Sequence, residues 1–168
     1  MIEMNLYSNE ELDGIKKDTE KNQKMEDFFD GRRVDWNKNI EPLFDVLKID
    51  VTNPSNFTKV LDAQSIALSL RQKINEEITI FLNKRSRETS KVKKARQDKF
   101  VFYATGFGIK TSMGEKAILI DGHLRETERT VEIIESYIEF LRDTIKNLES
   151  LSYAVKNMTD LLNYLGRN

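Results

Sequence analysis

Cysteine is absent from the 168 residues, and only two prolines are present. The lack of cysteine excludes disulfides and thiolate chemistry, so nothing indicates an oxidising compartment. No stretch approaches about 18 uninterrupted apolar residues, and the first residues show no basic segment followed by an apolar one. We therefore expect a protein of the cytoplasm with no membrane-spanning helix and no signal peptide.

Side chains suited to catalysis are equally scarce. His123 is the only histidine, so a zinc site would need three carboxylates, and we expect His123 to be an exposed residue in the first turn of a helix. No nucleophile is paired recognisably with a base. Residues 106–112 contain glycines and a lysine but lack the Gly-x-x-x-x-Gly-Lys spacing of a phosphate-binding loop. We expect no enzyme, no cofactor and no metal site.

Charged residues make up 33% of the chain and hydrophobic ones 39%, a mixture typical of long amphipathic helices. Residues 56–99 contain neither glycine nor proline, and their apolar residues recur at threes and fours, which predicts one long helix. A second long helix is expected from about residue 121 to residue 165. It shows heptad spacing, and we predict that this face drives oligomerisation through Val131, Ile134, Ile138, Leu141, Ile145, Leu148, Val155 and Leu162.

Four of the seven glycines lie between Tyr103 and His123, which predicts a Gly-rich connection there. Within it, residues 117–120 could be a short strand or a clamp on the core. Residues 1–40 carry a thin apolar stripe of Leu12, Ile15, Met25 and Phe28, and are interpreted as a loosely attached arm. Pro42 predicts a short helix that ends before a turn at residues 52–54.

The predicted fold is therefore all-α: two long amphipathic helices form a helical hairpin that self-associates, with a Gly-rich connection and a short N-terminal helical arm. We expect residues 1–40 to form the acidic arm, and residues 41–168 to form a helical domain that carries the functional basic segment and oligomerises. The charge pattern explains this division. Residues 1–45 hold twelve acidic and seven basic residues, whereas residues 84–99 hold eight basic and two acidic ones.

The basic segment, residues 84–99, comes directly before Phe100, Phe102, Tyr103 and Phe107. Lysine and arginine can follow phosphates while aromatic rings stack on bases, which is typical of a single-stranded nucleic-acid site. Phe100 and Phe107 fit the core better. The predicted contacts are Lys91, Lys93, Lys94, Arg96, Lys99, Arg85, Arg87, Phe102 and Tyr103. A solvated helix face, with the aromatic residues packed in the core, is the simpler alternative.

The motif Lys94-Ala95-Arg96-Gln97-Asp98, followed by a Gly-rich connection and an amphipathic helix, resembles the UvsY-type recombination mediator proteins of T-even and related phages. The resemblance runs from about residue 41 to residue 166. It departs from the family pattern after Asp98, where Lys99 precedes Phe100 in place of two aromatics, and the acidic arm has no counterpart.

The resemblance implies a DNA recombination and repair protein without enzymatic activity, located in the host cell cytoplasm. It would bind single-stranded DNA and help a RecA-like recombinase to displace single-strand-binding protein. It also implies a ring-like homo-oligomer of six or seven subunits, with Lys94 and Arg96 as the DNA-contacting pair. The rival interpretation is a non-enzymatic coiled-coil adaptor or scaffold whose basic segment docks an acidic protein partner, its own arm included.

Overall fold

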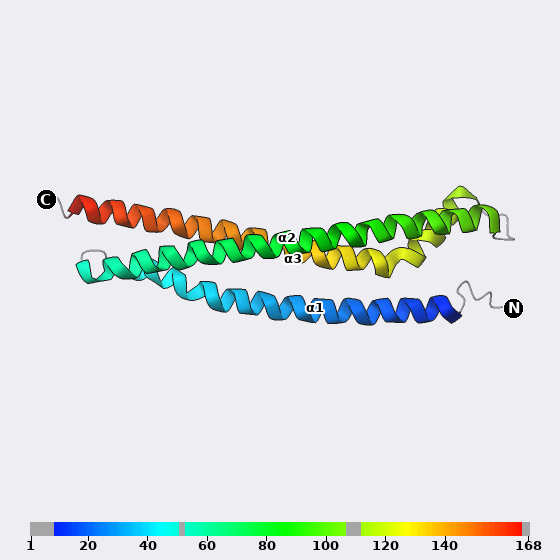
Figure 1. The fold of residues 1–168 in the computed structure, drawn as a ribbon, viewed down its shortest axis with the longest axis horizontal. Coiled ribbons are helices and arrows are strands. Elements are labelled where there is room, and N and C mark those ends of the chain that lie inside the picture. The colour runs from blue at the N-terminus through cyan, green and yellow to red at the C-terminus, as the bar shows by residue number, and fades with distance from the viewer. Residues whose placement is uncertain (1–8, 51–52, 107–111, 166–168) are drawn as a thin grey trace. The chain divides into compact units, whose positions relative to one another are not determined.

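The computed structural model describes residues 9–50, 53–106 and 112–165, and all regular structure within them is helical. The three long helices are α1 (Asn9–Phe44), α2 (Phe57–Val101) and α3 (Met113–Leu165) (Figure 1). Three short elements follow α1 or flank α2: η1 (Asp45–Lys48), η2 (Pro54–Asn56) and the π-helical turn η3 (Phe102–Gly106). The all-α prediction is confirmed, but the two-helix hairpin is wrong because a third long helix is present.

The helices divide into two compact units, and each helix contributes a segment to both. Unit 1 comprises Met1–Phe28 and Leu82–Ser136, and unit 2 comprises Phe29–Phe81 and Tyr137–Asn168. Among the described residues, no helix is long and apolar enough to cross a membrane.

In unit 1, α2 and α3 run antiparallel, as their ion pairs show. Arg85 of α2 pairs with Glu135, whereas Arg96, further along α2, pairs with the earlier residues Glu128 and Asp121 of α3. Of the two alternatives for residues 117–120, the short strand is wrong, because these residues belong to α3. Ile120 packs there in a small core with Leu124 and Tyr103.

A buried polar network fixes α1 against α3 within unit 1. The side-chain amide of Asn22 donates a 2.8 Å hydrogen bond to the main-chain carbonyl of Glu126. The hydroxyl of Thr130 donates a 2.6 Å hydrogen bond to Asn22 Oδ1. Asn22 and Thr130 are 2% and 1% exposed, so any other register would leave buried polar atoms without partners.

Three aromatic rings, one from each long helix, pack against one another in the core of unit 2. Phe29 stacks on Tyr137 with ring centroids 4.2 Å apart, and Phe81 meets both rings edge-on at 5.1 and 5.2 Å. The Tyr137 hydroxyl donates a 2.6 Å hydrogen bond to Glu77, which also forms an ion pair with Arg32. Burial, and then the contact with Glu77, raises the pKa of Tyr137 to about 12.

The N-terminal segment is a packed helix, which corrects its interpretation as a loosely attached arm. Its buried face repeats at helical spacing and comprises Asn22, Met25, Phe29, Trp36, Ile40 and Leu43. The predicted apolar stripe contained Phe28, which is 54% exposed, and left out Phe29, which is buried. It is also interrupted by Arg33, whose guanidinium lies 5.9 Å from the Tyr137 ring centroid and 5.7 Å from that of Phe140.

The boundaries of α2 match the prediction for residues 56–99 closely, whereas α3 begins well before residue 121. A reciprocal capping box starts α3: the Ser112 N–H donates to Glu115 at 2.7 Å, and the Glu115 N–H donates to Ser112 Oγ at 3.3 Å. Gly114 and Gly122 therefore lie inside a helix, not in a connection. Pro42 likewise lies inside the last turn of α1 and not at a helix start.

The heptad face predicted to drive oligomerisation is buried within the single chain. Ile134, Ile138, Leu141, Leu148 and Val155 are each at most 1% exposed, and Val131 and Ile145 are half-buried. The side chain of Leu162 lies outside the described part of the structure. The prediction is corrected for the physical reason that α1 and α2 already cover this face, so it is not available to a second subunit.

Candidate nucleic-acid interface

The basic segment lies entirely within α2, in the part that belongs to unit 1. Consecutive helical residues are about 100° apart around the axis, so its cations point in several directions. Arg87, Lys93 and Lys94 are exposed and make no ion pair with any residue that the structure describes. We call these three residues the cationic strip.

Glu88 lies among these cations but does not cancel their charge, because it is turned inward. Its side chain is 10% exposed and bonds to Lys91 at 2.8 Å, with Lys21 of α1 3.8 Å away. Burial tends to raise the pKa of Glu88, but Lys91 and Lys21 outweigh it and hold the pKa below its ordinary value of 4.5. Asp98 is the exposed carboxylate that remains in the segment.

The other predicted cations already have partners in unit 1. Arg85 lies 3.4 Å from Glu135, and Lys91 bonds to the buried Glu88. The Lys99 ammonium lies 5.9 Å from the centroid of the Phe102 ring. These residues can still contribute positive potential, but each would exchange an existing contact for a phosphate.

Arg96 is the most firmly held of the predicted cations. Its Nη1 donates to Asp121 Oδ1 at 2.7 Å and its Nη2 donates to Glu128 Oε1 at 2.6 Å. Because Lys94 and Arg96 are two residues apart, they point about 200° apart around the helix axis. The pair implied by the resemblance is therefore divided, with Lys94 facing solvent and Arg96 facing α3.

Two of the aromatic assignments are corrected. Tyr103 was predicted to stack on bases but is 4% exposed, whereas Phe100 was assigned to the core and is 47% exposed. Helical spacing explains both, because Tyr103 continues the inward face of Ala95, and Phe100 does not. Phe102 is 48% exposed and meets the Tyr103 ring edge-on at 5.3 Å, and Phe107 lies outside the described residues.

Phe100 has a direct relationship to the cationic strip. It follows Lys93 by seven residues, which is about two helical turns, so the two side chains lie on the same side of α2. Both are exposed. An exposed ring and an ammonium group on the same side of a helix, about two turns apart, suit stacking on an unpaired base with contact to a nearby phosphate.

His123 was predicted to be an exposed residue in the first turn of a helix. It is instead half-buried and does not lie in a first turn. It lies within α3, where the Tyr103 hydroxyl is 2.6 Å from its Nε2. The pair ties η3 to α3 and has the character of a structural contact.

No acidic side chain that the structure describes in α1 forms an ion pair with the cationic strip. Among the described residues, the ion pairs from α1 to the other helices of unit 1 run from Lys21 to Glu88 and from Glu26 to Arg129, the latter at 2.8 Å. Glu26 therefore meets a cation of α3 and not one of the strip, and Lys21 brings a cation, not a carboxylate, to Glu88.

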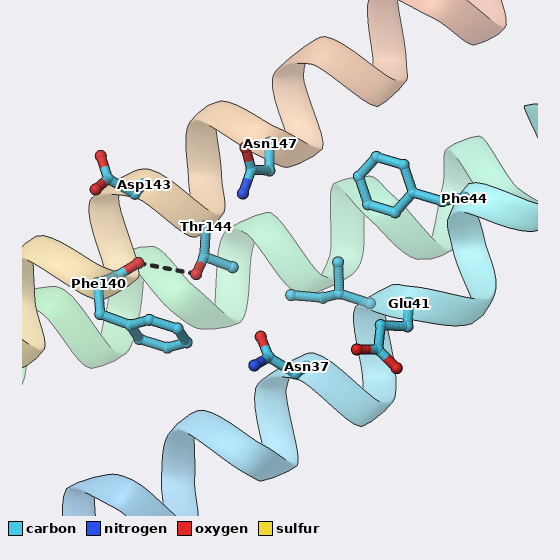
Figure 2. A pocket seen from close by; sticks show the side chains of 8 residues that line it. Asn37, Glu41, Phe44, Phe140, Asp143, Thr144 and Asn147 are labelled. Carbon is cyan, nitrogen blue, oxygen red and sulfur yellow. Dashed lines mark hydrogen bonds between the residues drawn. The ribbon is translucent and has the colours of Figure 1, made fainter.

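Unit 2 contains a pocket of about 230 Å³ between α1 and α3 (Figure 2). It is lined by Asn37, Ile40, Glu41, Phe44, Phe140, Asp143, Thr144 and Asn147. The Thr144 hydroxyl is committed to the Phe140 carbonyl at 2.8 Å, and Asp143 bonds to Lys146. The described residues contain no group of carboxylates or histidine that could hold a metal ion.

Comparison with protein-family models, with characterised proteins and with solved structures found no match to this chain.

Proposed function

We propose that this protein binds single-stranded DNA through the cationic strip and Phe100. The observation that carries the proposal is their arrangement on α2: Arg87, Lys93 and Lys94 are exposed without ion-pair partners among the described residues, and Phe100 shares a side with Lys93. The Glu88 side chain is buried, so its carboxylate lies away from this surface. Duplex readout has less support, since no recognition-helix pattern is present.

The resemblance to UvsY-type mediators supports a role for this binding in DNA recombination. The protein would act as a recombination mediator that helps to load a RecA-like recombinase onto DNA covered by single-strand-binding protein, without enzymatic activity. The ring of six or seven subunits is part of this proposal. Its interface would have to use residues other than Ile138, Leu141 and the rest of the buried heptad face.

A ring would suit the chemistry of the strip. One strip neutralises few phosphates, so a single chain should bind weakly and with strong dependence on salt. Several strips held together raise the effective concentration of the second and later contacts and can retain one strand.

The test is fluorescence anisotropy of a labelled single-stranded oligodeoxythymidylate over a salt series. The variant Lys93→Ala/Lys94→Ala should weaken binding and reduce the slope of log K against log salt by about 0.7 for each phosphate that is no longer neutralised. The matched control is Lys16→Ala/Lys17→Ala, which removes two adjacent exposed lysines of α1 in the same unit.

Equal losses in the two double variants would mean that net charge, and not the strip, governs binding. Absence of binding by the wild-type protein at low salt would reject the mediator and favour the adaptor, whose basic segment docks an acidic protein.

A further inference from the structure

Arg96 lies between two carboxylates of α3 that are seven residues apart and thus on one side of that helix. Its two Nη atoms are each bonded, one to Asp121 and one to Glu128. The side chains of Arg96, Asp121 and Glu128 are 46%, 59% and 37% exposed. The contact, which we call the Arg96 clamp, is therefore accessible from solvent.

The Arg96 clamp occupies the atoms with which arginine grips a phosphate. The guanidinium binds phosphate through pairs of parallel N–H donors, as it binds carboxylates. A phosphate that reached Arg96 would thus compete with Asp121 and Glu128 for the same donors. Exposed ion pairs contribute little to stability, so an incoming phosphate can displace the two carboxylates from Arg96.

We propose that Asp121 and Glu128 are intramolecular competitors of the nucleic-acid backbone, which hold Arg96 back in the free protein and release it when a strand binds. This inference rests on the proposed function, since it concerns the regulation of the same site. It assigns the gating of the basic segment to carboxylates of α3. Among the described residues, Glu26 of α1 pairs with Arg129 and not with Arg96.

Release of Arg96 from the clamp should also increase the number of phosphates that the protein contacts. Without competitors, Arg96 adds one phosphate contact to those of the cationic strip. The salt dependence should then steepen by about 0.7 in the slope of log K against log salt for single-stranded DNA. A general loss of negative charge without a new contact would raise affinity with a smaller change in slope.

The experiment compares the wild-type protein with Asp121→Asn/Glu128→Gln, which keeps the side-chain shapes and removes both charges. We expect this variant to bind the labelled oligodeoxythymidylate about three- to tenfold more tightly. Glu139→Gln/Asp143→Asn is the matched control, because it removes two exposed carboxylates of α3 in unit 2. It should bind as the wild-type protein does.

A second comparison isolates Arg96. In an Arg96→Gln background, removal of Asp121 and Glu128 should give no more gain than the control, because no guanidinium remains to be released. A full gain in that background would overturn the inference, as would wild-type affinity in the Asp121→Asn/Glu128→Gln protein. Both outcomes would leave the proposed function intact, whereas a wild-type protein that fails to bind would reject the two together. Circular dichroism checks that every variant is folded.

Discussion

Thr130 of α3 donates a 2.6 Å hydrogen bond to Asn22 of α1, and both side chains are buried. This bond joins residues 108 positions apart. It places the N-terminal helix in the core of unit 1. The acidic N-terminal segment is thus part of the folded structure and not an appendage.

Asn22→Ala should lower the free energy of unfolding by about 1–3 kcal/mol, because it leaves buried polar groups of α3 without a partner. Urea denaturation followed by circular dichroism measures the change. Asn39→Ala is the control, since Asn39 is exposed and bonds to the Asp35 carbonyl of its own helix. Similar stability of the two variants would contradict the importance of the buried network.

Trp36 is the only tryptophan and is 6% exposed, so it reports on the packing of α1 in unit 2. Its emission should be blue-shifted in the native protein and should move to the red in urea. The shift should coincide with the loss of helical signal if α1 unfolds together with the other helices. Native emission typical of a solvated indole would restore the interpretation of a loosely attached arm.

Tyr137 should make stability depend on alkaline pH. Its pKa is raised from 10.0 to about 12 in the folded protein, because burial and the contact with Glu77 disfavour the phenolate. The stability that this provides is complete below pH 10.0 and is lost as pH rises through about 12. Urea midpoints measured across this window should fall less steeply for Tyr137→Phe than for the wild-type protein. Parallel curves would show that other groups cause the dependence.

Leu141 is fully buried in unit 2, so its replacement should affect folding before assembly. Leu141→Ala should cost about 2–5 kcal/mol through reduced burial and the cavity it leaves, and Leu141→Asp should abolish the cooperative helical transition. Circular dichroism and size-exclusion chromatography separate the outcomes. A well-folded Leu141→Asp protein of smaller size would instead support the heptad face as a subunit interface.

Phe100→Ala should weaken binding of single-stranded DNA by about 1–3 kcal/mol if one base stacks on the ring. Because the ring carries no charge, the slope of log K against log salt should stay unchanged. Tyr153→Ala serves as the control, since Tyr153 is an exposed aromatic residue of unit 2. Unchanged affinity in Phe100→Ala would reduce the proposed site to the cations alone.

Much of the fold follows from local periodicity. The absence of glycine and proline across residues 56–99 predicted α2 almost to its ends. The early start of α3 also has a local signal, the capping box of Ser112 and Glu115, which the prediction did not use. The buried face of α1 was missed partly because Arg33 interrupts its apolar residues. The Arg33 guanidinium packs over the rings of Tyr137 and Phe140, which the sequence alone does not reveal.

The sequence by itself determined the helical class, the position of the basic segment within one helix and the order of cations and rings along it. Spacing along a helix is local, so it can be read without knowledge of the packing. Only the tertiary structure decided which of those side chains are available. Arg96 meets Asp121 and Glu128 across 25 and 32 residues, and Tyr103 meets His123 across 20. Such contacts depend on how α2 and α3 pack, and no local pattern specifies them.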